Sequence, residues 1–176
     1  MPQFNPFPEL TSQRLRLRKL DNEDVHQVFS LRSDDQVNFF LDRQPASSIN
    51  DAQLFIDRIN NNLDKNGLPY WAICLKENPR LIGTICYFDF SPSDQSAEIG
   101  YELHPFYQKK GIMQEAIAIV IHFGFKVLQL KTITAFLSHD NLSSIKLLEK
   151  NGFKKDESFL SEGNGRQFVR YILNHE

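Results

Sequence analysis

The chain has 176 residues, of which 41% are hydrophobic and 24% are charged, and its formal net charge is −2. This length suits one domain with a hydrophobic core, so we expect a single domain over residues 1–176. The composition excludes a disordered chain, and the slightly negative charge argues against a nucleic-acid-binding protein, which would normally carry a strongly basic face.

The N-terminus, MPQFNPFPEL, has no basic segment followed by an apolar stretch, and no apolar run approaches membrane-spanning length. We therefore expect a cytoplasmic protein without a membrane partner. Cys74 and Cys86 lie in strand-like segments and lack the CxxC spacing of a zinc or redox site. We expect buried free thiols, no disulfide and no metal.

The first predicted elements are one strand and two helices. In SQRLRLRKL (12–20) leucines alternate with arginines, which predicts a half-buried strand with Arg14, Arg16 and Arg18 on its outer face. Asp21 can cap a helix whose apolar residues are Val25, Val28, Phe29 and Leu31. A second helix should run from about Ile49 to Leu63, closed by Asn66-Gly67, with an inner face made of Leu54, Phe55, Ile59 and Leu63.

Three strands follow these helices. YWAICLK (70–76) and LIGTICYFDF (81–90) flank the turn signal ENPR, which predicts an antiparallel hairpin. After the break at SPSD, SAEIGYEL (96–103) predicts another strand. It should end at His104-Pro105, because proline lacks the N–H group that a sheet ladder needs. We expect His104 to be structural.

The C-terminal half begins with a helix from Gly111 to about Val127, whose apolar stripe contains Met113, Ala116, Ile117, Val120, Phe123 and Val127. KTITAFLS (131–138) predicts a strand. A short helix opened by Asp140 or Asn141 should run through Leu148 and end at Gly152. GFKKDESF and RQFVRYIL, joined by SEGNG, predict a closing hairpin.

This order predicts an α/β fold of mixed α+β character, with one mixed, mostly antiparallel sheet of about seven strands and helices on both faces. The strands at 96–103 and 131–138 are joined through a long helix. We therefore expect them to be parallel neighbours with a right-handed crossover.

The segment YQKKGIMQEA (107–116) places a cationic loop at the start of the long helix. First-turn amides have no intrahelical partners, and with the helix dipole they form an anion site. Gly111 would let the backbone approach a ligand, while Lys109 and Lys110 add positive charge, so a diphosphate would suit the loop. The alternative is an ordinary solvated turn, because short motifs often match by chance.

The stretches AEIGYELHPFYQKKGIMQEA and DNLSSIKLLEKNGF resemble the acetyl-CoA-binding core of the GNAT superfamily of N-acyltransferases. TSQRLRLRKLDNEDV and LIGTICYF extend the resemblance, in the same order, to the branch that contains the Rim-type ribosomal-protein N-terminal acetyltransferases. The family's diphosphate signature is Gln or Arg, two variable residues, Gly, one variable residue, then Gly or Ala. Residues Gln108, Lys109, Lys110, Gly111 and Ile112 fit it, and Met113 departs from it at the last position.

The resemblance implies that the amides of this loop hold the coenzyme A diphosphate. It also implies that the strand carrying Glu98 to Leu103 splays from its parallel neighbour around a bulge. The pantetheine arm would then bond the freed backbone groups, and Leu103 is the residue that we place there.

Acetyl transfer to an amine needs a proton acceptor and a means of protonating the leaving thiolate. We select Glu98 as the acceptor, with Glu102 as the substitute. The alternative is that Glu98 is an ordinary polar residue on a wet sheet face or a structural ion-pair partner. The resemblance implies that Asn141 bonds the pantetheine and that Ser144 donates a proton to the sulfur. Asn141 would also be expected there as a helix cap, and Ser144 as a first-turn residue that bonds its own backbone.

The predicted function is therefore an acetyl-CoA-dependent N-acetyltransferase that acts by direct attack of a primary amine. The acceptor suggested by the branch is a protein N-terminal α-amino group, for example that of a ribosomal protein, and the alternative is a small amine such as a polyamine, an amino acid or an antibiotic. Two rival classes are a non-catalytic coenzyme A-binding module and an interaction domain without coenzyme. A homodimer would fit the exposed edges of an open sheet.

Overall fold

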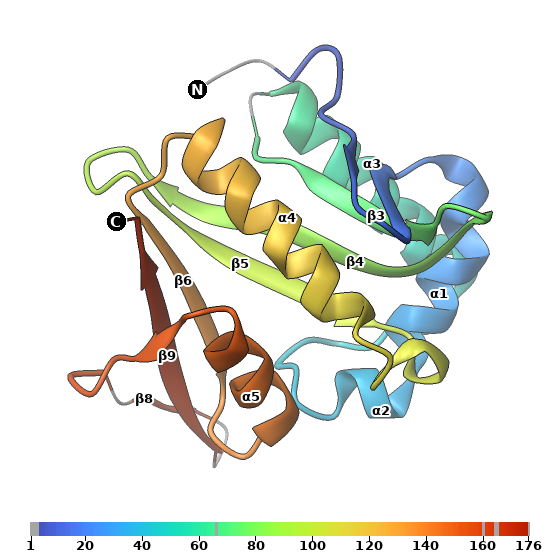
Figure 1. The fold of residues 1–176 in the computed structure, drawn as a ribbon. Coiled ribbons are helices and arrows are strands. Elements are labelled where there is room, and N and C mark those ends of the chain that lie inside the picture. Colours follow the sequence, from blue (N-terminus) through green and yellow to red (C-terminus); the bar gives the residue numbers. More distant parts are fainter. Residues whose placement is uncertain (1–3, 66, 160, 164–165, 176) are drawn as a thin grey trace.

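A mixed sheet runs through the molecule and carries helices on its two faces (Figure 1). The computed structural model of the protein describes residues 4–65, 67–159, 161–163 and 166–175. In chain order, the elements are β1 (Leu10–Thr11), β2 (Leu15–Lys19), the 3-10 helix η1 (Asn22–Asp24), α1 (Val25–Ser33), α2 (Asp35–Asn38), α3 (Ile49–Asp64), β3 (Tyr70–Leu75), β4 (Asn78–Ser91), β5 (Ser96–Leu103), the 3-10 helix η2 (Pro105–Tyr107), α4 (Ile112–Lys126), β6 (Thr132–Ser138), α5 (Leu142–Lys150), β7 (Lys154–Lys155), β8 (Ser161–Gly163) and β9 (Arg166–Asn174).

The strand order is β1-β2-β3-β4-β5-β6-β9-β7, with β8 paired to β9. The predicted parallel pair is confirmed, because β5 and β6 are parallel neighbours on either side of α4 in the sequence, whereas β4 and β9 flank them antiparallel. The described part of the sheet has nine strands against about seven predicted. The two additional ones are the short strands β1 and β8, which carry too few residues to show an alternating pattern, and β7 occupies only two residues of the predicted strand GFKKDESF.

The two parallel strands diverge partway along their length. Their register pairs run from Ser96 with Thr132 to Glu98 with Thr134, whereas β5 continues to Leu103. The predicted splay is therefore present. The bulge was expected in β5, but the nearby pairing irregularity lies in its antiparallel neighbour β4, after Phe88, where Asp89 has a φ of 47°.

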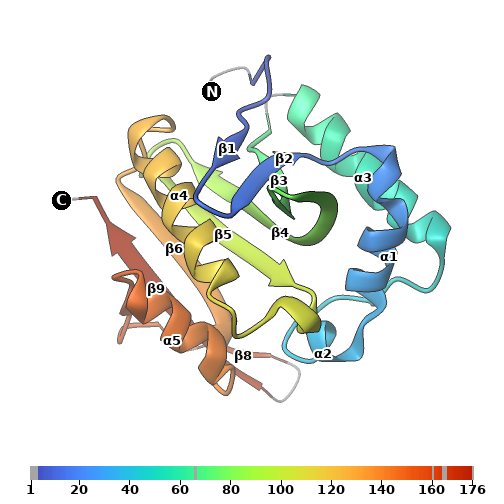
Figure 2. The same cartoon turned by 45° about the vertical axis from the view of Figure 1, so that its right-hand side comes forward.

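The core on one face of the sheet forms beneath α4, which crosses the strands diagonally in Figure 1, and α5 lies on the same side (Figure 2). The apolar spacing of α4 turns Ala116, Ile117 and Val120 fully inward, against Leu15, Trp71 and their neighbours in the strands. Val127 departs from the prediction. It follows the end of the helix and its side chain is 54% exposed.

The core on the opposite face lies under α1 and α3 and includes Val28, Leu31 and Ile56. Figure 2 shows these two helices together on the far side of the sheet from α4. Leu54 was expected on the inner face of α3, but its side chain is 59% exposed, and Ala52 and Ile56 are fully buried. The helical stripe is therefore offset by part of a turn from the predicted one.

Several predicted boundaries differ from the structure in detail. The hairpin between β3 and β4 is tighter than ENPR suggests, because β4 already begins at Asn78. Gly67 donates its N–H to the Asn62 carbonyl at the end of α3, and Asn66 lies outside the described residues. Part of the predicted connector SEGNG is strand β8, and its residues 164–165 are also outside the described residues.

The two cysteines, Cys74 and Cys86, are buried as free thiols. Burial raises the pKa of the Cys74 thiol, and it also raises that of Cys86, so neither is a thiolate at neutral pH. Within the described residues, none of the helices combines the length and the apolar character needed to cross a membrane.

Candidate active site

The backbone at the start of α4 adopts left-handed angles at two residues, and its amides lack partners among the described residues. Lys109 has a φ of 61° and Gly111, the N-cap residue, has a φ of 74°. The first helical bond runs from the Glu115 N–H to the Gly111 carbonyl (3.1 Å). In the described part of the chain, no hydrogen-bond acceptor is found for the N–H groups of residues 109–113. Together with the helix dipole, these amides can bind an anion.

A cleft of about 780 Å³ opens beside these amides, between the C-terminal end of β5, the start of α4, α5 and the segment around α2. Its lining includes eight of the residues selected from the sequence, namely Leu103, Gln108, Lys109, Gly111, Ile112, Met113, Asn141 and Ser144. The residues come from three separated segments of the chain. The splay of β5 from β6 lies at the same place and leaves room between the two strands.

The backbone of Leu103 faces the gap left by the diverging strand. The next residue, His104, donates its N–H to the Ile82 carbonyl of β4 (2.9 Å). Because successive residues of a strand direct their backbone groups to opposite sides, the N–H and C=O of Leu103 point away from β4. The Gln108 side chain already donates to the Leu103 carbonyl (2.9 Å), so Gln108 ties the loop to the end of β5.

Lys110 was selected with Lys109 as a compensating cation, but the two side chains differ in position. Lys109 lines the cleft, whereas the Lys110 ammonium lies over the Phe106 ring, 4.1 Å from its centroid. The Lys110 carbonyl accepts a hydrogen bond from Arg14 (3.1 Å). The contribution of Lys110 to an anion site is therefore its backbone amide, because its side chain is held against an aromatic ring.

Asn141 and Ser144 lie together at the start of α5. Asn141 is the N-cap residue, and its Oδ1 accepts a hydrogen bond from the Ser144 N–H (3.2 Å). Among the described residues, no partner is found for the Nδ2 group of Asn141, whereas the Ser144 hydroxyl lies within hydrogen-bonding reach of the Tyr101 phenol. Burial raises the pKa of the Tyr101 phenol to about 12, and an interaction with Ser144 opposes that rise. Tyr101 also lines the cleft and is a neutral hydrogen-bond donor at physiological pH.

Glu98 lies at the point where β5 and β6 separate, and it is not one of the described residues that line the cleft. Its pKa is raised from 4.5 to about 7, first by burial and then by the charge of Asp89, while a hydrogen bond from the Phe136 backbone opposes the rise. A carboxyl group that titrates near neutral pH can exchange protons under working conditions. Its position requires water to carry the proton to or from the cleft.

Glu102, the substitute candidate, does line the cleft and is buried in a charged cluster. Its Oε2 lies 2.6 Å from Arg43 Nη2, its Oε1 lies 3.9 Å from Arg32 Nη1, and Thr84 donates a hydrogen bond to Oε1 (3.2 Å). Arg43 belongs to the connection between α2 and α3. Glu102 therefore holds the segment that forms the α2 side of the cleft against β5.

The sequence patterns did not select the other residues that line the cleft. From α2 and its continuation come Gln36, Val37, Phe40 and Leu41, and from α5 come Ser143, Lys146, Leu147 and Lys150. Lys146 and Lys150 are four residues apart, a spacing that puts both on one face of α5. That spacing is visible in the sequence, but only the fold shows that this face borders the cleft.

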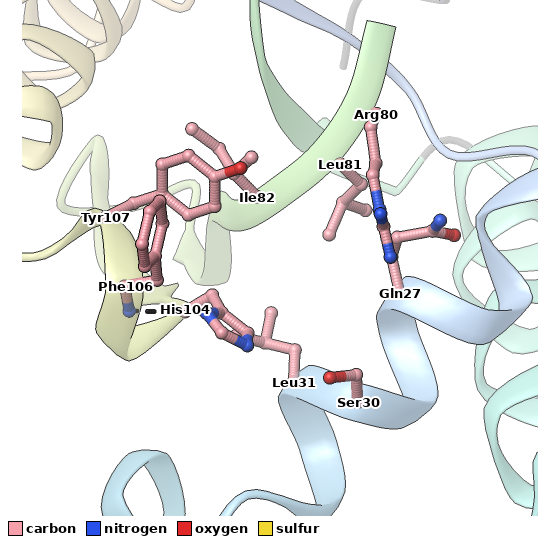
Figure 3. A pocket seen from close by; sticks show the side chains of 9 residues that line it. All are labelled: Gln27, Ser30, Leu31, Arg80, Leu81, Ile82, His104, Phe106 and Tyr107. Carbon is pink, nitrogen blue, oxygen red and sulfur yellow. Dashed lines mark hydrogen bonds between the residues drawn. The ribbon is translucent and has the colours of Figure 1, made fainter. Parts of the chain in front are cut away.

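A second, smaller pocket of about 240 Å³ lies between α1, β4 and η2 and shares no lining residue with the cleft among the residues described (Figure 3). The His104 side chain lies on its wall, and His104 Nδ1 accepts the Phe106 N–H (3.3 Å). His104 therefore caps η2, which agrees with its expected structural role.

A model of the family described as acetyltransferase (GNAT) domain matches residues 14–154. Among curated proteins, the chain is 33% identical over 150 residues to the uncharacterized N-acetyltransferase YoaA of Bacillus subtilis, covering 85% of each chain. It is 31% identical over 94 residues to the ribosomal-protein-serine acetyltransferase of Escherichia coli, covering 53% of this chain and 52% of that protein. The spermidine N(1)-acetyltransferase of E. coli is 22% identical, with coverage of 94% and 89%.

Solved structures share the fold at lower sequence identity. RimL, a ribosomal L7/L12 α-N-protein acetyltransferase solved with coenzyme A, superposes with a TM-score of 0.82 at 18% identity, covering 95% of this chain and 98% of that chain. The spermidine N-acetyltransferase of Vibrio cholerae, solved with CoA and spermine, has a TM-score of 0.78 at 20% identity, covering 93% and 96%. The two structures show that one fold accommodates both kinds of protein.

Proposed function

Because this chain belongs to the GNAT family of N-acetyltransferases, we propose that it transfers the acetyl group of acetyl-CoA to the α-amino group of a peptide or protein. The N–H groups at the start of α4 would bind the diphosphate, and Lys109, which lines the cleft, adds a positive charge. The backbone of Leu103 and the Nδ2 group of Asn141 would bond the pantetheine amides. The thioester would then lie near Ser144.

The charge of the residues that line the cleft is the main reason to propose a peptide rather than a polyamine as the acceptor. Glu102 is the one acidic residue among the described residues that line it, and Arg43 lies 2.6 Å from its carboxylate. Lys109, just before α4, and Lys146 and Lys150 of α5 add positive charge to the lining of the cleft. A polyamine carries several positive charges and would meet few acidic partners here, so like-charge repulsion disfavours it. A peptide N-terminus brings a single amine that can lose its proton.

In the proposed reaction the amine nitrogen attacks the thioester carbonyl directly, and the carbon–sulfur bond then breaks. Glu98 accepts the proton of the amine through water and returns it to solvent. Ser144 donates a proton to the leaving sulfur and recovers one from solvent. Because a thiol with a pKa of about 8.5 is already a fair leaving group, Ser144→Ala should lower kcat only about tenfold.

The test is thiol release from acetyl-CoA with a panel of acceptors: peptides with free N-termini, spermidine, amino acids and an aminoglycoside. A peptide with a blocked N-terminus and an internal lysine is the matched control for α-amine selectivity. We expect turnover and an N-terminal mass increase of one acetyl group only with the unblocked peptides. A higher kcat/KM for spermidine, or coenzyme binding without turnover of any acceptor, would contradict the proposal.

A further inference from the structure

Arg14, at the residue before β2, reaches across to the start of α4. Its backbone N–H donates to Glu115 Oε1 (2.9 Å) and its Nε donates to Glu115 Oε2 (2.7 Å). The Ser12 hydroxyl donates to the same carboxylate (2.5 Å), and the Arg14 carbonyl accepts the Lys76 N–H (2.9 Å). The main chain of Arg14 is therefore fixed from two sides, and Glu115 holds its guanidinium beside the first turn of α4.

The two terminal nitrogens of the Arg14 guanidinium, Nη1 and Nη2, lie beside Lys110 and Gly111 at the start of α4. Arg14 Nη1 donates to the Lys110 carbonyl (3.1 Å), and a Cβ placed on Gly111 would lie 3.5 Å from Arg14 Nη2. Arg14 itself is not among the described residues that line the cleft, whereas Gly111 is. The guanidinium thus borders the Lys110–Gly111 peptide from a side other than the cleft.

This hydrogen bond determines the direction of one amide. The Lys110–Gly111 peptide is trans, and in a trans peptide the C=O and N–H groups point in opposite directions. Because Arg14 holds the carbonyl, the Gly111 N–H must point away from Arg14. We propose that Arg14 is a positioning residue that orients the Gly111 N–H toward the diphosphate of acetyl-CoA, an inference that rests on the proposed function.

The loop needs such a restraint because little else sets the orientation of this peptide. Gly111 has a positive φ of 74°, and glycine allows the preceding peptide to rotate at low cost. The charge of Arg14 is matched by Glu115 at 2.7 Å, so its direct attraction for a phosphate is reduced. The expected contribution of Arg14 is therefore the orientation of the Gly111 amide rather than added positive charge.

The experiment compares Arg14→Met with Arg16→Met, which removes an exposed arginine of β2 that pairs with Glu9. The readouts are CoA affinity by calorimetry and the kinetics of two acyl donors, acetyl-CoA and acetyl-pantetheine, which lacks the diphosphate. Arg14→Met should weaken CoA binding and raise the KM for acetyl-CoA by about three- to tenfold, the loss expected for one hydrogen bond. Its kcat with acetyl-CoA and its kcat/KM with acetyl-pantetheine should match the wild type, as should all values for Arg16→Met.

Arg14→Lys provides a second variant that keeps the charge. A lysine lacks the fork geometry that lets one side chain bridge Glu115 and Lys110, so this variant should also weaken CoA binding. Wild-type affinity in either Arg14 variant would overturn the inference, and so would equal losses with the two acyl donors. Wild-type protein that binds CoA without turning over any amine would instead contradict the proposed function, and the calorimetric comparison of variants would still decide the role of Arg14.

Discussion

The carboxyl group of Glu98 links stability to pH. Its pKa is raised from 4.5 to about 7, chiefly by burial and next by Asp89, so between these values the folded protein binds more protons than the unfolded chain. Stability must then fall as pH rises through this window. We expect Glu98→Gln to remove this dependence, so that wild type loses stability relative to the variant between pH 5 and pH 8, as measured by urea denaturation.

The same variant tests the proposed role of Glu98 as a proton acceptor. If the group accepts the amine proton, kcat/KM should rise with pH through about 7 in the wild type, and Glu98→Gln should lower kcat by about a hundredfold. Glu77→Gln changes an exposed carboxylate in the β3–β4 turn and should alter neither property. Full activity in Glu98→Gln, combined with loss in Glu102→Gln, would assign the role to Glu102.

Individual site residues differ in how far the sequence could predict them. Gln108 to Ile112 form one contiguous stretch that fits a local pattern, so the pattern was sufficient to select them, whereas Met113 was selected only by its place at the end of that stretch. The contact between Arg14 and Glu115 joins segments far apart in the chain, and no local pattern reports it. The raised pKa of Glu98 depends on burial and on Asp89, whose proximity follows from the pairing of β4 with β5.

At the scale of the element, Asn141 combines a cap for α5 with a proposed contact to the pantetheine. Its Oδ1 accepts the Ser144 N–H (3.2 Å), so Asn141→Ala should destabilise the protein by about 1 kcal/mol. Asn141→Asp keeps a capping oxygen and loses only the Nδ2 donor. Its stability should remain near that of the wild type, whereas both variants should bind CoA about three- to tenfold more weakly by calorimetry. Unchanged CoA affinity in Asn141→Asp would leave Asn141 as a helix cap alone.

Whether a segment is a helix or a strand was easier to predict than which of its residues are buried. The stripe of α4 was correct from Met113 to Phe123, because a long periodic run defines its own buried face. The predicted burial was wrong for Val127, which follows the last helical turn, and for Leu54 on the predicted inner face of α3, because both side chains are exposed. Periodicity gives the angle between side chains, but the position of the buried stripe also depends on the neighbouring helix, here α1 against α3.

At the scale of the whole molecule, one sheet separates two hydrophobic cores. Trp71 and Ile73 of β3 project into the core beneath α4, while Ala72 and Cys74 of the same strand project into the core beneath α1 and α3. The sequence order predicted this layering, because helices precede and follow the strands. The position of the cleft did not follow from it, since the cleft arises where β5 leaves β6 and where α2 approaches β5.

Because the two cores share one sheet, we expect them to unfold together. Small destabilising substitutions in different cores should then have additive effects on the free energy of unfolding. Ile117 of α4 and Ile56 of α3 are each fully buried, in different cores. Ile117→Val and Ile56→Val should each lower the free energy of unfolding by about 0.5–1.5 kcal/mol, because each deletes one buried methylene. Because the two residues belong to different cores, the double variant should equal the sum within about 0.5 kcal/mol.

Denaturant melts followed by tryptophan fluorescence and by circular dichroism measure this sum. Trp71 is fully buried in the core beneath α4, so its fluorescence reports that side of the sheet, whereas circular dichroism reports all helices. Coincident transitions are expected for the wild type and for all three variants. If Ile56→Val shifted only the dichroism curve, the two cores would unfold separately, and the sheet would not couple the stability of the core beneath α3 to that of the core beneath α4.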